Sequence, residues 1–488
     1  MQGFLELADK KSKRIPRGVI ALLFGQIIHN YEAEIFSTLE ELIAIPSVAD
    51  SSKGEPGSPF GADAKKALAF ILQKAEAMGF SVKNADGYAG HAEYDSGSGG
   101  TAAVLGHVDV VPAGTGWNTD PYKMTEKDGL LFGRGVLDDK GACVVALYCM
   151  KALKDHGVKG RRKIRCIFGS GEEIGMLDMP HYFAEEPLPD LAFTPDGDYG
   201  ICNREKGILR FSVSHKNDSP FIHSFHSGEV ANAVPDRAVA EISCTKEQAE
   251  RLRREAEARK EPCTVLFDEK TQTAEPLMEG RAAHAREPEN GRNAAAHLIR
   301  LLGKVFGEEA LGSLFRFFSQ TVNLDTTGEG FGIAQRDEPS GSLTFNTGMV
   351  HMETEGAITF DIRYPVTTDG EALIETLRTF CEDHQMKFDL GDHMVPLYAK
   401  EDSELVSVLK DAYRAVTGEE ALLYSTGGGS YARCIPGRCV AFGPLFPGEP
   451  ERNIHQANEH VDKALFLKHA EICLEAMYRM IEPNDVTG

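Results

Sequence analysis

The chain has 488 residues, of which 42% are hydrophobic, so it can bury a large core and more than one domain is expected. Its 52 basic and 74 acidic residues give a formal net charge of −22, and no basic run offsets this excess. An acidic surface of this kind repels nucleic acid and anionic lipid, so we expect neither as a partner and attribute the charge to solubility.

The first predicted element is an amphipathic helix within the opening 32 residues. The apolar stretch at 18–28 is too short to span a bilayer, and no clear cleavage site follows it. No other apolar run has membrane-spanning length, and the ten cysteines are scattered without a C-x-x-C pair. These features predict a cytoplasmic protein with reduced thiols.

Residues 1–205 alternate between helix and strand signals. Apolar strands that alternate with amphipathic helices predict a mostly parallel sheet with helices on both faces. The predicted strands are 101–111, 163–170 and 191–197, and the predicted helices are 34–45, 61–80 and 143–157.

The pattern changes over 206–398 and then changes back. Strands in this middle segment alternate as half-exposed strands do, and charged amphipathic helices flank them, which predicts an α+β domain. Residues 399–488 return to the buried pattern. The simplest organisation is an α/β domain, made of residues 1–205 and 399–488, that an α+β domain at 206–398 interrupts. Middle strands are predicted at 208–217, 237–244 and 356–365, middle helices at 244–260, 293–307 and 369–384, and later elements at 404–418, 438–444 and 462–481.

Metal-ligand side chains follow the predicted strands where these end, at the edge where open α/β sheets bind ligands. His107 and Asp109 lie in GHVDVVP. As alternate strand residues they share one face, so Asp109 can orient the ring of His107 and leave its other nitrogen for a metal. Taken alone, the pair equally fits a half-buried histidine beside a surface acid.

Two acidic pairs come next along the chain. Asp138 and Asp139 in GRGVLDDKG precede a predicted helix, where they suit either a helix cap or a metal-bridging carboxylate. Glu172 and Glu173 in FGSGEEIG follow a strand. One of them could bind metal while the other acts as a base, although adjacent acids are also often simply solvated.

Asp196 in FTPDGD and His455 in NIHQANEH complete the set, although alone they suit a turn and a surface loop. Together the candidates supply two imidazoles and three carboxylates. Zinc accepts these ligands, and a set without thiolate fits a hydrolytic site better than a structural one. Two ions roughly 3.5–4 Å apart, bridged by one carboxylate, would polarise a carbonyl and generate hydroxide together.

In this order, GHVDVVP, GRGVLDDKG, GSGEEIG, PDGD and HQANE resemble the motifs of the di-zinc exopeptidase superfamily of carboxypeptidase G, aminoacylases and carnosinases. The likeness is greatest to the PepV-type bacterial dipeptidases and runs from about residue 34 to the end. It implies an α/β catalytic domain with a mostly parallel sheet, interrupted by an inserted α+β lid domain.

The resemblance also implies a role for each candidate. Asp138 would bridge two zinc ions, with a cis peptide to Asp139, and manganese or cobalt could replace zinc at such a site. Glu172 would be the general base and Asp109 would orient His107. The other ligands would be His107 and Asp196 for one ion, and Glu173 and His455 for the other.

Matching positions in the inserted domain are Asn232 in VANAVPDRA, His284 in GRAAHAREPENGRNA and Arg363 in ITFDIRYP. By resemblance Asn232 binds substrate, His284 stabilises the oxyanion, and Arg363 pairs with the substrate carboxylate, as a planar guanidinium can. Ser430 and the glycines before it, in STGGGSYARCIP, could hold a substrate terminus. Arg286 departs from the family, which commonly has serine there. Without the family, Asn232 and Arg363 would suit an ordinary loop and a surface ion pair.

The function that follows is zinc-dependent hydrolysis of dipeptides by a metal-bridged hydroxide. In the family that the chain resembles, dipeptidases and aminopeptidases have aspartate at the position of Asp196 and carboxypeptidases often have glutamate, so the resemblance implies a dipeptidase. The long insertion resembles the double-sized lid of the PepV type, which implies a monomer that acts on small peptides. The alternative on the same di-zinc site is an N-acyl amino acid deacylase or a related amidohydrolase. A metal-binding or peptide-binding protein without catalysis is a third hypothesis, which the complete ligand set and the presence of Glu172 oppose.

Overall fold

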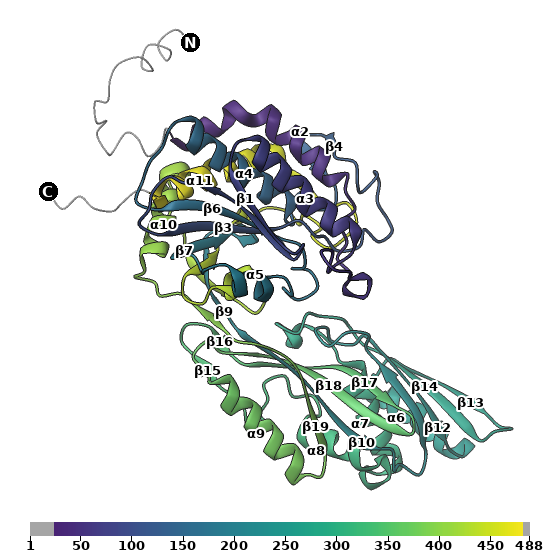
Figure 1. Cartoon of the computed structure of the whole chain (residues 1–488). Coiled ribbons are helices and arrows are strands. Elements are labelled where there is room, and N and C mark those ends of the chain that lie inside the picture. The colour runs from purple at the N-terminus through teal and green to yellow at the C-terminus, as the bar shows by residue number, and fades with distance from the viewer. Residues whose placement is uncertain (1–23, 482–488) are drawn as a thin grey trace. The chain divides into compact units, whose positions relative to one another are not determined.

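The computed structural model describes residues 24–481, which divide into two compact units (Figure 1). Within this range, unit 1 contains the chain up to Asn203, Ala399–Tyr424 and the residues from Ser430 onward, and unit 2 contains Arg204–Tyr398 and Ser425–Gly429. Most of the amphipathic helix predicted for the first 32 residues lies outside the described residues. Among the described residues, no helix is both long and apolar enough to cross a membrane.

Unit 1 is built on a mixed sheet of nine strands. The sheet includes the strands that lie at the boundaries between the two units along the chain. Its centre is parallel, because β6, β3, β7 and β22 pair with one another in the same direction. Both edges are antiparallel. The prediction of a mostly parallel sheet is therefore right only for the centre.

The order of strands in this sheet is β1-β2-β6-β3-β7-β22-β9-β20, with β21 also paired to β9. Their bounds are β1 Ser81–Ala85, β2 Ala89–Tyr94, β3 Thr101–His107, β6 Lys163–Gly169, β7 Leu191–Thr194, β9 Ile201–Glu205, β20 Leu397–Tyr398, β21 Leu423–Thr426 and β22 Cys439–Ala441.

Five helices of unit 1 share one buried hydrophobic cluster with the sheet, and α5 lies on the other side of the sheet (Figure 1). Sequence spacing predicted these longer helices to within a few residues, because each alternates apolar and polar positions with the helical period. The helices of the cluster are α2 Glu32–Ile43, α3 Ala62–Ala77, α4 Lys140–Asp155, α10 Glu404–Thr417 and α11 Lys463–Ile481, and α5 is Met179–Glu185.

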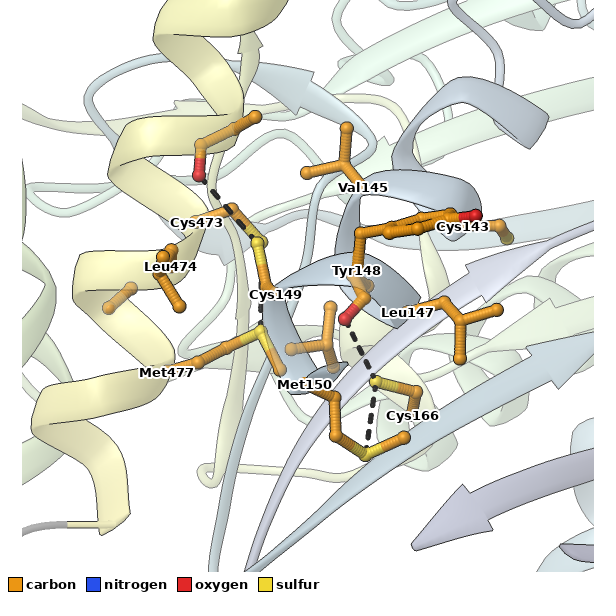
Figure 2. Close-up of a cluster of buried hydrophobic side chains, with 14 of the residues drawn as sticks. Cys143, Val145, Leu147, Tyr148, Cys149, Met150, Cys166, Cys473, Leu474 and Met477 are labelled. Atoms are coloured by element: carbon orange, nitrogen blue, oxygen red, sulfur yellow. Dashed lines mark hydrogen bonds between the residues drawn. The ribbon is translucent and has the colours of Figure 1, made fainter. Parts of the chain in front are cut away.

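Helix α4 is buried along most of its length, and it begins directly after Asp139. Figure 2 shows its buried side chains against α11 and β6, where several thiols pack as small hydrophobic groups. The Sγ of Cys149 contacts the carbonyl of Ala470 at 3.6 Å, and the Sγ of Cys166 contacts that of Ala146 at 3.5 Å. All ten cysteines are free, and burial raises the pKa of the Cys149 and Cys166 thiols.

Unit 2 is built on an antiparallel sheet of eight strands in the order β13-β14-β12-β11-β17-β18-β10-β19. Four helices pack on it through a second buried cluster, which is the α+β arrangement predicted for the middle of the chain. The strands are β10 Gly207–Lys216, β11 Ile222–Ser227, β12 Arg237–Ser243, β13 Cys263–Asp268, β14 Thr273–Glu279, β17 Thr344–Met352, β18 Glu355–Tyr364 and β19 Lys387–Met394. The helices are α6 Lys246–Ala258, α7 Ala294–Phe306, α8 Ser313–Thr321 and α9 Gly370–Asp383.

The short glycine-rich segment Ser425–Gly429 groups with unit 2, although it lies within the part of the chain assigned by sequence to the α/β domain. Two hydrogen bonds explain this difference. The backbone N–H of Lys206 donates to the carbonyl of Thr426 at 3.0 Å, and Nη1 of Arg363 donates to that of Gly427 at 2.8 Å. The second boundary of unit 2 therefore depends on contacts that the sequence pattern does not contain.

A buried histidine makes unit 1 sensitive to acid. His469 of α11 is 1% exposed, and its Nδ1 lies 2.8 Å from the hydroxyl of Tyr199. Burial lowers the pKa of His469 to about 3, whereas an unfolded histidine titrates near pH 6.5. Between about pH 6.5 and pH 3, this histidine is therefore protonated in the unfolded chain and neutral in the folded one. The free energy of unfolding consequently falls as the pH falls.

We expect the free energy of unfolding to lose up to about 1.4 kcal/mol per pH unit to this one group below about pH 6. The His469→Gln variant should lack that part of the slope, and the exposed His156→Gln variant should retain it. Urea unfolding of the three proteins between about pH 5 and pH 7 measures the slopes. Equal slopes for the wild type and His469→Gln would contradict this account.

Candidate metal centre

Three segments that carry predicted ligands leave the sheet side by side. β3 ends at His107, β6 ends just before the segment with Glu172 and Glu173, and β7 ends two residues before Asp196. β3 lies between β6 and β7 and runs parallel to both, with His107 opposite Gly169. Because parallel strands end at the same edge, their ligand-type side chains are gathered there, as the sequence predicted.

Asp138 is the centre of the cluster. Its Oδ1 lies 3.0 Å from Nε2 of His107, and its Oδ2 lies 2.9 Å from Nε2 of His455. Nε2 of His455 is also 3.1 Å from Oε2 of Glu173. One carboxylate thus lies between two imidazoles, which is the arrangement expected of a bridging ligand.

Asp139, the neighbour of Asp138, contacts the backbone of His107 and not its ring. The peptide bond between Asp138 and Asp139 is cis, as the family resemblance implied. Asp139 stands at the N-cap position of α4, but its side chain makes no capping hydrogen bond. It is buried, and its Oδ2 accepts the backbone N–H of His107 at 3.1 Å. The helix-cap interpretation of this acidic pair is therefore wrong.

The charges in the cluster suit a bound cation. Hydrogen bonds to Asp138 and Glu173 raise the pKa of His455 to about 10, so these carboxylates strongly favour a positive charge at that position. The other oxygen of Glu173, Oε1, is buried and has no hydrogen-bond partner among residues 24–481. Ligand atoms about 2.0–2.2 Å from a tetrahedral zinc lie about 3.3–3.6 Å apart, which is close to the separations in this cluster. The residues present therefore fit a divalent metal.

Glu172 lies beside the cluster and is half-buried. Burial raises its pKa well above the usual value, and the charges of Asp196 and Glu173 raise it further, against an opposing effect of His107. The charge of Asp196 also raises the pKa of Asp139. Glu172 can therefore hold a proton more readily than an exposed glutamate.

Asp109 has a broader role than the sequence suggested. Nδ1 of His107 lies 3.0 Å from the backbone oxygen of Asp109 and 3.5 Å from its carboxylate, so the backbone makes the shorter contact. The carboxylate accepts the backbone N–H groups of Glu172 at 3.2 Å and Glu173 at 3.1 Å. Asp109 therefore joins the segment that carries both glutamates to the histidine ligand.

Asp178 and Tyr431 were not singled out from the sequence. Asp178 is buried and accepts the backbone N–H groups of Ser170 at 2.8 Å and Gly171 at 2.9 Å, together with the hydroxyl of Tyr431. The ring of Tyr431 lies edge-on to His107, 6.1 Å between centroids. Burial and the charge of Asp109 raise the pKa of Asp178 to about 6.

The three residues predicted in the inserted domain lie near one another within unit 2. The backbone N–H of Ala285 donates to the carbonyl of Asn232 at 2.9 Å, and Ala233 forms a bridge with His284. The hydroxyl of Thr344 donates to the carbonyl of Ala285 at 3.0 Å, and Thr344 pairs with Arg363 in the sheet. Thr344 therefore links the loop of His284 to the strand of Arg363.

Arg363 and His284 also make contacts within unit 2. Nε and Nη2 of Arg363 pair with the two oxygens of Asp361, at 2.6 and 3.0 Å. His284 is exposed, and its Nδ1 accepts the backbone N–H of Arg286 at 3.0 Å. Partial desolvation and the charge of Arg363 lower the pKa of His284. Ser430 is a buried residue of unit 1, and its hydroxyl accepts the N–H of Ala432 at 3.3 Å.

Comparison with known proteins identifies a family and several relatives. The model of peptidase family M20/M25/M40 matches residues 103–482. "Putative dipeptidase YtjP" of Bacillus subtilis is 34% identical over 92% of this chain and 99% of its own length. A Staphylococcus haemolyticus protein, also named a putative dipeptidase, is 31% identical over 94% of this chain and 99% of its own length.

Two solved structures share the fold. Human carnosine dipeptidase 1 has a TM-score of 0.58 and 17% identity over 95% of this chain and 99% of its own. The dipeptidase Dug1p of Saccharomyces cerevisiae has a TM-score of 0.59 and 15% identity over 96% of this chain and 100% of its own. At these identities the likeness establishes the fold alone.

Proposed function

We propose that this chain, which belongs to peptidase family M20/M25/M40, is a dipeptidase that acts through two divalent metal ions held around Asp138. The observation that carries the proposal is the position of the Asp138 carboxylate, 3.0 Å from His107 and 2.9 Å from His455. Relatives that match nearly end to end and are named dipeptidases support the choice of substrate.

The proposed ligands form two pairs, one for each ion, with Asp138 shared between them. His107 and Asp196 would hold one ion, and Glu173 and His455 would hold the other. Zinc suits these nitrogen and oxygen donors, and manganese or cobalt could replace it. When bound, two such ions polarise a carbonyl group and lower the pKa of water.

Glu172 is the proposed general base. It would take a proton from the attacking water as the C–O bond forms at the peptide carbonyl. It would then give that proton to the leaving nitrogen as the C–N bond breaks, so that the two products are amino acids. Burial raises the pKa of the Glu172 carboxyl, so the group keeps a proton more readily than an exposed glutamate does, as the second transfer requires.

Unit 2 is proposed to act as the lid that recognises the substrate. His284 would donate a hydrogen bond to the developing oxyanion, and Arg363, with Asn232, would bind the peptide carboxylate. Ser430 and the preceding glycines would hold a substrate terminus. Such a lid would admit only small peptides, and we propose that one chain is sufficient for activity.

A panel of substrates tests the proposed specificity. We expect dipeptides with a free amine to be cleaved at least about tenfold faster, by kcat/KM, than N-acyl amino acids, since about 1.4 kcal/mol of transition-state binding gives this ratio. The measurement is release of amino acids from both substrate classes at saturating metal. A higher kcat/KM for the N-acyl compounds would instead identify a deacylase on the same site.

A further inference from the structure

Arg134 and Glu459 form a buried ion pair in unit 1, although they are 325 residues apart in the chain. Nη1 of Arg134 lies 2.7 Å from Oε2 of Glu459, and the two side chains are 1% and 0% exposed. Neither residue was singled out from the sequence. A buried charge needs a partner and further hydrogen bonds, so the groups that these two side chains bind reveal what the pair holds in place.

Glu459 binds the backbone immediately before Asp138. Its Oε1 accepts the N–H groups of Gly135 at 3.1 Å, Leu137 at 3.1 Å and Asp138 itself at 3.2 Å. Gly135 has a φ of 84°, a conformation that favours glycine, which lets the chain curl around the carboxylate. One side chain thus fixes the backbone from which the Asp138 carboxylate projects.

Arg134 binds the loop that carries His455. Its Nη2 donates to the backbone oxygen of Gln456 at 3.1 Å and to that of Pro112, near Asp109, at 3.4 Å. His455 has a φ of 61°, in the left-handed region that non-glycine residues seldom adopt without support from their surroundings. The guanidinium therefore supplies contacts that hold this loop.

We propose that the Arg134–Glu459 pair positions Asp138 and His455 so that both can bind one metal ion. The inference rests on the proposed function, in which these two residues are metal ligands. Arg134 and Glu459 touch neither metal nor substrate in this account; they act through the backbone of the two ligand segments. Contacts behind the ligands commonly set metal affinity in this way.

The chain contains a natural reporter for this pair. Trp117 is its only tryptophan. The ring lies 5.3 Å from Cζ of Arg134, and Nε1 donates to the carbonyl of Ala113 at 2.7 Å. Its fluorescence therefore reports on the surroundings of Arg134 without interference from other tryptophans.

The test compares metal affinity in full-length variants after chelation. We expect Glu459→Gln and Arg134→Lys each to bind zinc about 10–100-fold more weakly than the wild type, measured by competition with a chromophoric chelator. Saturating zinc should restore kcat to within about threefold, because the ligands themselves are unchanged. Trp117 emission should shift in Arg134→Lys while the far-UV circular dichroism stays the same.

Glu404→Gln is the matched control. Glu404 forms a bidentate pair with Arg162 at 2.7 and 2.8 Å, also in unit 1, but holds no ligand segment. Wild-type zinc affinity in both test variants, or an equal loss in Glu404→Gln, would overturn the inference while leaving the proposed function intact. A wild-type protein that binds none of zinc, manganese and cobalt would overturn the proposed function as well.

Discussion

The Glu172→Gln variant should lose roughly 10²–10⁴-fold in kcat for dipeptides and still bind metal like the wild type. Glutamine keeps the size of the side chain but cannot accept the proton of the attacking water. The structure places Glu172 beside the cluster, where its backbone N–H is held by Asp109 at 3.2 Å, so the substitution should leave the ligands in place.

The measurement is kcat at saturating metal together with the metal content of the same preparation. Glu40→Gln, which changes an exposed glutamate of α2, is the control and should behave as the wild type. Activity within about tenfold of the wild type in Glu172→Gln would show that another group is the base.

Asp138→Asn should have an even larger effect on metal binding. Its carboxylate contacts both imidazoles, at 3.0 and 2.9 Å, and an amide has only one oxygen to offer. Since changes behind a ligand already cost 10–100-fold, we expect loss of this ligand to weaken zinc binding by more than about 100-fold.

The control for this variant is Asp402→Asn, which removes a negative charge from an exposed position of unit 1. It isolates the effect of net charge on cation binding. An Asp138→Asn protein that retained two tightly bound ions would refute the bridging role, even if its activity were low.

The edge that carries the site could be predicted because parallel strands are apolar along their whole length and end together. Strands β3, β6 and β7 were recognised in this way, and with them the neighbourhood of His107, Glu173 and Asp196. The ligand chemistry could be predicted for a similar reason, since imidazoles and carboxylates are the side chains that a hydrolytic metal site uses.

The antiparallel edge of the same sheet was not predicted. β1 and β2 form a hairpin at Asp86 and Gly87, both of which have positive φ, at 50° and 79°. An Asp-Gly pair between short strands is a hairpin signal, so this turn was available in the sequence and was missed. The half-buried residues of β1 gave no clear apolar run to draw attention to it.

The residues that hold the ligands could not be read from the sequence pattern. Asp178 and Glu459 act by accepting backbone N–H groups, and any buried aspartate or glutamate could do so. Their partners are fixed by the fold, and the contact of Glu459 with Arg134 joins positions 325 residues apart. The contact of Asp109 with the segment that carries Glu172 could not be predicted either. It depends on the pairing of β3 with β6, which the fold determines.

The central claim is that Asp138 joins two metal ions that dipeptide hydrolysis requires, and metal add-back after chelation tests it most directly. The chelated wild-type protein should be inactive towards dipeptides, and activity should return with zinc, manganese or cobalt as binding approaches about two ions per chain. Full hydrolysis by protein that holds less than about one ion per chain would contradict the account.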